Sequence, residues 1–200
     1  MTPEKPRLVV LISGSGSNLQ AILDACTAGS LPAQVAAVIS NKAEAYGLER
    51  ARTAGVPALV KAKLKEMDRQ VYDVELADLV ESFHPDWVVL AGWMRLLSSR
   101  FLSRFPNRVV NLHPALPGTF PGTHAIERAF TAWQNGEITH TGVMVHLVPD
   151  EGVDNGPLLA AEPLEILPQD TLETLEARVH ALEHRLLVET LARLACGKIP

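Results

Sequence analysis

The residues best suited to chemistry are an amide and an imidazole two positions apart, Asn111 and His113, at the end of the apolar run that begins at Val109. In an extended strand, side chains at i and i+2 lie on the same face. The Pro- and Gly-rich segment 114–122 follows, where neither a helix nor a central strand can continue. A neutral donor beside a titratable donor at a strand end is typical of an oxyanion site. A structural strand end with one satisfied polar pair would show the same pattern.

A second candidate is the loop 13–18, with the sequence Ser-Gly-Ser-Gly-Ser-Asn, between an apolar strand and a helix. Its glycines let the backbone approach a phosphate, and the helix N-terminus offers free N–H groups. Leu19 stands where a dinucleotide fingerprint has its third glycine, and 40–42 supplies no acidic residue for a ribose. The loop therefore predicts phosphate binding or a plain tight turn, not a dinucleotide site.

Two further segments follow apolar runs. The first, 91–97, comes after a buried strand, at the sheet edge where ligands bind in open α/β folds. Its residues Trp93, Met94 and Leu97 line an apolar slot for a flat ring, or belong to the core. The second, 150–157, carries three carboxylates and two glycines. One of these carboxylates could orient His113 or accept a proton, although most such turns are only solvated loops.

Three histidines invite other interpretations. His180 and His184, with Glu183 between them, match the HxxEH pattern of a zinc peptidase family. Such a site needs a third ligand, and Glu189 is the sole candidate in the remaining chain. We therefore favour solvated helix positions or a polar helix end that touches a ligand, and we expect no metal. His146 lies on an alternating segment, where it is structural or faces the same cleft as His113.

The order of elements predicts an α/β fold: a Rossmann-like, mostly parallel sheet flanked by helices on both faces, with antiparallel C-terminal strands and a long C-terminal helix. A helical stripe in the third helix comprises Val71, Val74, Leu76, Leu79 and Val80. Ser17 or Asn18 is the expected cap of the first helix, and Asp170 or Thr171 that of the last. The predicted strands are 7–12, 35–40, 56–60, 87–91, 108–112, 141–148 and 157–163, and the predicted helices are 19–28, 45–54, 68–83, 124–133 and 171–194.

Composition limits the class of protein. A chain of 200 residues with 47% apolar residues suits a single domain, 1–200, with a sizeable core. The net charge of −5, without a basic block, argues against nucleic acid or an anionic membrane as partner. Two distant cysteines and an N-terminal apolar run within 1–10 that is too short for a signal or a membrane span predict a soluble cytoplasmic protein.

Taken together, these segments resemble the glycinamide ribonucleotide formyltransferases (GAR transformylases) of the folate-dependent formyltransferase superfamily. The Asn-x-His-Pro motif with a later Asp is shared by the superfamily, whereas the Ser-Gly-x-Gly-Ser-Asn-Leu-Gln opening points to this member. Methionyl-tRNA formyltransferase and formyltetrahydrofolate deformylase look similar but carry an extra domain, for which we expect no room here. The segments that carry the resemblance are 10–20, 40–42, 47–51, 90–97, 111–114 and 150–157.

The resemblance implies transfer of a formyl group from 10-formyltetrahydrofolate, a co-substrate, to the amine of glycinamide ribonucleotide in de novo purine biosynthesis. It implies that Asn111 and His113 stabilise the tetrahedral oxyanion and that His113 helps to protonate the departing folate nitrogen. Asp154 matches the third catalytic residue, which keeps His113 charged and oriented and helps to remove the amine proton. The inserted Gly152 leaves Asp150 as the alternative. The chemistry needs no metal.

Binding residues are implied by the same match. Gly16, Ser17 and Asn18 correspond to the phosphate site, and Glu183 with His180 to the sugar-phosphate end. The folate pocket corresponds to Met94, Arg95, Leu96 and Leu97 together with Asn111, and Arg69 matches a folate-side arginine. Half 1–100 is then the nucleotide-phosphate half, and 101–200 the catalytic and folate half. In Ala115–Gly118 the chain departs from the more usual Ser-Leu-Leu-Pro.

Three alternatives stay open at this stage. Within the superfamily, the protein is a hydrolase or a transferase to another amine, such as that of a sugar nucleotide. In a different class, it binds a folate or a nucleotide without catalysis, which the joint presence of Asn111, His113 and Asp154 speaks against. The expected partners are small molecules only. The sequence leaves the oligomeric state, monomer or homodimer, undecided.

Overall fold

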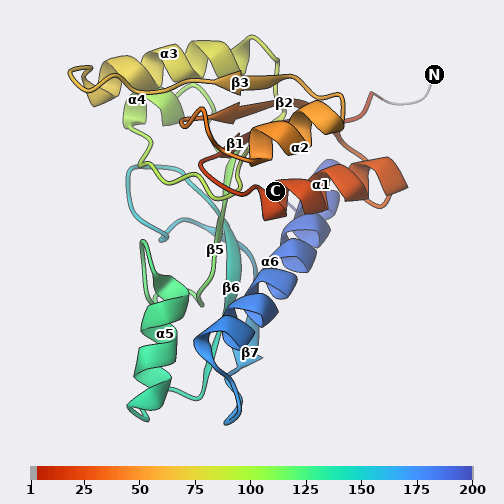
Figure 1. Ribbon diagram of the computed structural model, residues 1–200. Helices are drawn as coiled ribbons and strands as arrows, with labels where there is room; N and C mark the ends of the chain where they lie inside the picture. Colours follow the sequence, from red (N-terminus) through yellow and green to blue (C-terminus); the bar gives the residue numbers. More distant parts are fainter. Residues whose placement is uncertain (1–3, 200) are drawn as a thin grey trace.

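The computed structural model describes residues 4–199 and has one seven-stranded sheet in the order β3-β2-β1-β4-β5-β6-β7 (Figure 1). Residues 1–3, part of the N-terminal stretch assigned no signal, lie outside the described residues. The strands are β1 (Arg7–Ile12), β2 (Gln34–Ser40), β3 (Ala58–Val60), β4 (Trp87–Leu90), β5 (Val109–His113), β6 (His140–Leu147) and β7 (Leu158–Glu165). The helices are α1 (Ser17–Ala28), α2 (Gly47–Thr53), α3 (Arg69–Glu81), α4 (Ser99–Leu102), α5 (Ala125–Gln134) and α6 (Leu172–Ala195).

Both faces of the sheet are covered, as the continuous apolar strands predict. Alternate residues of β1 enter two separate cores: Leu8 packs in the core beneath α1, α5 and α6, and Val9 packs in the core beneath α3 and α4. Strands β1 to β5 pair in parallel, whereas β6 and β7 are antiparallel. The predicted fold class is confirmed.

The strand order places the loops that matter at one edge of the sheet. The chain runs outward from β1 to β2 and β3, then returns to the other side of β1 with β4. This reversal is the switch point at which open α/β sheets bind ligands, outside the carboxyl ends of the strands. The loops after β1, β4 and β5 all leave the sheet at this edge.

The start of α1 differs from the prediction. Its N-cap is Gly16, in a left-handed conformation with φ 71°, and no side chain caps the helix. The expected cap by Ser17 or Asn18 is therefore wrong. A Cβ on Gly16 would lie 2.7 Å from the Cα of Gly47, so a close approach of two backbone segments requires glycine here.

The buried face of α3 also differs from the predicted stripe. Leu76 and Val80 are buried, but Val71 and Val74 are 52% and 38% exposed, and Tyr72 and Asp73 point inward instead. Both of these polar groups have partners: Tyr72 Oη donates to the carbonyl of Lys61, and Asp73 Oδ2 accepts from the amide of Ser98 at 2.6 Å. Polar side chains with such partners are buried at little cost, which apolar periodicity does not reveal.

Three further features of the helices can be compared with the sequence-based expectations. Thr171 is the N-cap of α6, in a capping box with Thr174, as expected. The four-residue helix α4 was not predicted, because one turn is too short to show a periodicity. None of the described helices is both long and apolar enough to cross a membrane.

The buried contact of Asp73 with Ser98 gives a stability prediction, because it fixes the end of the segment 91–97. Asp73→Ala should lower the unfolding free energy by about 1–3 kcal/mol, since it leaves a buried amide without an acceptor. Urea unfolding measures this. The control is Asp78→Ala on the same helix, whose exposed carboxylate pairs with Arg104 and should matter little. Equal effects of the two variants would show that the Asp73–Ser98 contact adds no particular stability.

Candidate active site

A cavity of about 570 Å³ opens at the carboxyl edge of the sheet. Its wall combines the ends of β4, β5 and β6, the segment 92–97, the start of α5, the loop 150–154 and two residues of α6, Glu176 and His180. The volume is within the range of small-molecule sites. Segments far apart in the sequence therefore meet at the edge that the topology predicts.

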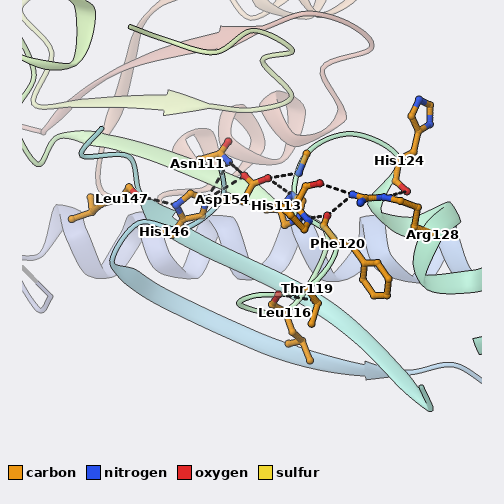
Figure 2. Close-up of polar contacts among 12 residues, drawn as sticks. Asn111, His113, Leu116, Thr119, Phe120, His124, Arg128, His146, Leu147 and Asp154 are labelled. Atoms are coloured by element: carbon orange, nitrogen blue, oxygen red, sulfur yellow. Dashed lines mark hydrogen bonds and ion pairs between the residues drawn. The ribbon is translucent and has the colours of Figure 1, made fainter. Parts of the chain in front are cut away.

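Asn111, His113 and Asp154 come together on this wall (Figure 2). Asn111 Nδ2 donates to Asp154 Oδ1 at 3.0 Å, and His113 Nδ1 lies 3.2 Å from Asp154 Oδ2. Asp150 also lines the cavity, but it accepts from the amide of Gly152 in its own loop. The carboxylate that contacts His113 is therefore that of Asp154.

His146 completes the cluster from the neighbouring strand. Its Nδ1 donates to the carbonyl of Leu147 at 2.8 Å, so in the neutral ring Nε2 carries a lone pair. Asn111 Nδ2 lies 3.2 Å from this Nε2 and can donate to it. Both amide hydrogens of Asn111 are then used, toward His146 and Asp154, and its oxygen turns away from Asp154 (Figure 2). The alternation of β6 was the signal for this histidine, which does face the cleft.

Each ring nitrogen of His113 faces an acceptor. Nε2 lies 3.1 Å from the carbonyl of Phe120, and Nδ1 faces Asp154. Burial lowers the pKa of His113 below its ordinary value, and the charge of Asp154 and the Phe120 carbonyl oppose this shift. The ring is therefore poised to be neutral at rest, while its surroundings offer an acceptor to each N–H of the protonated form.

The Asp154 carboxylate is ionised at neutral pH. Burial by itself raises the pKa of Asp154, but the hydrogen bond from the Gly122 amide and the neighbouring imidazoles of His146 and His113 outweigh burial and lower the pKa overall. The Gly122 amide donates to Asp154 at 2.8 Å, whereas His146 Nε2 lies 3.6 Å from the carboxylate and forms no hydrogen bond with it. Asp154 also has a positive φ of 50°, which is unusual for a residue other than glycine.

The predicted phosphate loop does not line this cavity, but it is joined to its wall. The amide of Ser13 donates to the carbonyl of Gly92 at 3.0 Å, and the amide of Met94 donates to Ser13 Oγ at 2.9 Å. Arg50 Nε donates to the carbonyl of Ser15, which fixes the loop from the other side. Gly16, Ser17 and Asn18 therefore lie one short segment away from the cavity wall.

The segment 93–97 serves both as core and as cavity wall. Trp93 and Leu97 are buried and line the cavity, whereas Met94 and Leu96 are 66% and 52% exposed at its rim. Arg95 also lines it, with its guanidinium 5.0 Å from the ring centroid of Tyr72. Trp93 and Leu97 therefore belong to the core and to the cavity wall at the same time.

Arg69 lies outside the cavity wall and pairs with Glu151, which does line it. Glu151 Oε1 also accepts from the amide of Ser99 at 2.9 Å. This arrangement links the loop of Asp154 to α3 and α4. No local sequence pattern indicates this contact, because the paired residues are 82 positions apart.

In the HxxEH segment, His180 and Glu183 form an ion pair beside the cavity. His180 lines the cavity, and its Nδ1 lies 2.6 Å from Oε2 of the buried Glu183. This hydrogen bond raises the pKa of His180. Within residues 4–199, no cluster of three or more His, Cys, Asp or Glu side chains is placed to hold a metal ion.

Comparison with known proteins identifies the family. The model of the formyl transferase family matches residues 6–191. Phosphoribosylglycinamide formyltransferase of Schizosaccharomyces pombe is 48% identical over 94% of this chain and 96% of its own length. The enzyme of that name from Escherichia coli is 41% identical over 96% of this chain and 88% of its own length.

Solved structures agree with this match. The crystal structure of glycinamide ribonucleotide transformylase 1 from Symbiobacterium toebii has a TM-score of 0.92 and 43% identity, covering 100% of this chain and 92% of that one. Phosphoribosylglycinamide formyltransferase from Bacillus halodurans gives a TM-score of 0.86 and 40% identity, over 94% of both chains. With its fold, its cavity and its sequence in agreement, the chain belongs to the formyl transferase family.

Proposed function

We propose that this protein transfers a formyl group from 10-formyltetrahydrofolate to the amine of glycinamide ribonucleotide in purine biosynthesis. The observation that carries the proposal is the contact of one ionised carboxylate, Asp154, with both Asn111 and His113 on the wall of the cavity. The formyltransferase names of relatives that match nearly the whole chain support it.

The reaction needs an oxyanion site. The amine nitrogen attacks the formyl carbon, a C–N bond forms, and the carbonyl oxygen becomes negatively charged before the bond to folate N10 breaks. Asn111 and His113 are the donors we assign to this oxygen. In the structure their N–H groups bond to Asp154, His146 and the Phe120 carbonyl, so a formyl group must replace one of these acceptors.

The reaction also moves one proton from the amine to N10. Asp154 is ionised and can accept the amine proton, directly or through water. His113 lies between two acceptors and can carry a proton toward the departing nitrogen while Asp154 balances its charge. Because the proton lost by one nitrogen is gained by the other, no metal or redox group is required.

The binding roles are assigned to the cavity wall and to the segments joined to it. We assign the phosphate to Gly16, Ser17 and Asn18, where α1 offers free amides, and the ribose end to His180 and Glu183. The exposed apolar rim suits the folate, which we assign to Met94, Arg95, Leu96 and Leu97 beside Asn111. For Arg69 to bind a carboxylate of the folate tail, it must exchange its partner Glu151.

The proposal includes the domain organisation, the localisation and the partners expected from the sequence. The chain acts as a single domain, with 1–100 as the nucleotide-phosphate half and 101–200 as the catalytic and folate half. It works in the cytoplasm on small molecules, as a monomer or a homodimer. A deformylase-like hydrolase and a transferase to another amine are the competing activities, because the oxyanion site serves any formyl transfer.

The choice between Asp154 and Asp150 tests the proposal. Asp154→Asn should retain ligand binding but lower kcat by about 10²–10³, because it removes the carboxylate that orients His113 and takes the amine proton. The absorbance change of the formyl-folate donor measures the rate. Asp150→Asn is the matched control from the same loop and should keep most of its turnover. The opposite ranking would move the catalytic role to Asp150.

The lowered pKa of His113 predicts a pH dependence of stability. Below about pH 6.5 the imidazole binds a proton in the unfolded chain more readily than in the folded protein. The free energy of unfolding therefore decreases as the pH falls. His113→Asn removes this contribution. Denaturant unfolding from about pH 8 to about pH 5 should therefore show the stability of the wild type falling relative to that of the variant. A stability difference that is constant, or that moves in the opposite direction, would show that the pKa is not lowered.

A further inference from the structure

The loop 118–122 contacts both members of the His113–Asp154 pair. The carbonyl of Phe120 accepts from His113 Nε2, at 3.1 Å, and the amide of Gly122 donates to Asp154 Oδ2, at 2.8 Å. Phe120 has a positive φ of 47°. A residue with a Cβ adopts this conformation only where surrounding contacts stabilise it. Something outside the reacting groups must therefore hold this loop in place.

Arg128, an exposed residue on α5, supplies these contacts (Figure 2). Its Nη2 donates to the carbonyls of Phe120 and Pro121, each at 2.6 Å, and its Nε lies 3.4 Å from the carbonyl of His124. The guanidinium carbon is 5.9 Å from the ring centroid of Phe120. One side chain thus binds two consecutive carbonyls of the loop and approaches the carbonyl of the α5 N-cap, with donors in the rigid planar arrangement typical of arginine.

The Phe120 carbonyl is shared by Arg128 and His113. Because the guanidinium fixes the position of this oxygen, it also fixes the acceptor that faces Nε2 of the imidazole. Without it, His113 would keep only Asp154 as an oriented partner, and the ring could rotate out of the plane that presents both nitrogens. The orientation of His113 therefore depends on a residue that lies outside the lining of the cavity.

We propose that Arg128 is a positioning residue for formyl transfer, acting through the Phe120 carbonyl on His113. The inference rests on the role proposed above for His113. A side chain that orients a group used in the transition state, without touching the substrates, should affect kcat much more than KM. This separates it from a residue that only attracts anionic substrates, because loss of such a residue raises KM.

Arg128→Met tests this, because it keeps an unbranched stem and removes every N–H donor. We expect kcat to fall about tenfold, with KM for both substrates within about twofold of the wild type. Arg128→Lys retains a charged donor and should recover most of the lost rate. The charge-matched control is Arg52→Met, since Arg52 is exposed and pairs only with the neighbouring Glu49 among the contacts described for residues 4–199. It should retain the kcat of the wild type.

A double-mutant cycle with His113→Asn shows whether Arg128 acts through His113. If it does, Arg128→Met costs little or nothing further in the His113→Asn protein, whose residual turnover is the reference. A general weakening of the fold would instead give the same fold-loss in both backgrounds, and that result would overturn the inference. The inference would also be overturned if Arg128→Met kept the kcat of the wild type while His113→Asn lost turnover. A His113→Asn protein with full turnover would overturn the proposed role of His113 and this inference together.

Discussion

The site depends on one buried carboxylate and the donors around it. Asp154 is fixed by Asn111 from β5, by the amide of Gly122 and by His113, so that a single charge joins a strand and two loops. Burying a charge is costly unless it is paired and hydrogen-bonded, and here the lowered pKa of Asp154 shows that its partners outweigh the cost of burial. The same carboxylate supplies the charge that a protonated His113 requires. In the proposed reaction, structure and chemistry therefore rely on the same contacts.

The fold contributes by bringing loops to one edge. Parallel strands β1, β4 and β5 end at the same side of the sheet, and the antiparallel β6 adds His146 directly beside Asn111 in the pairing of β5 with β6. The predicted phosphate loop reaches the cavity wall through the Ser13–Met94 contact, and Glu151 joins the Asp154 loop to α3 and α4. Of the proposed catalytic groups, Asn111 and His113 lie at a strand end, which is rigid, whereas Asp154 comes from a loop.

Much of this was predictable from the sequence, for physical reasons. The apolar strands and the spacing of Asn111 and His113 follow from local periodicity, and the fold class is confirmed. Other features arise from long-range contacts that no local pattern encodes: the backbone approach of Gly16 to Gly47, the inward Asp73 and the Arg69–Glu151 pair. The Arg128–Phe120 contact belongs to the same group, because an exposed arginine on a helix is usually only solvated. The residue roles carried by the family resemblance stay predictions.

In the proposed reaction, a formyl group moves in this cavity from a folate to the amine of a ribonucleotide. The most direct measurement follows the absorbance of 10-formyltetrahydrofolate with the purified protein, with and without glycinamide ribonucleotide. We expect turnover that requires the ribonucleotide and yields its formylated product. Equal turnover without the ribonucleotide would identify a hydrolase and contradict the claim. Saturable folate binding with no turnover toward this acceptor would contradict the proposed acceptor as well.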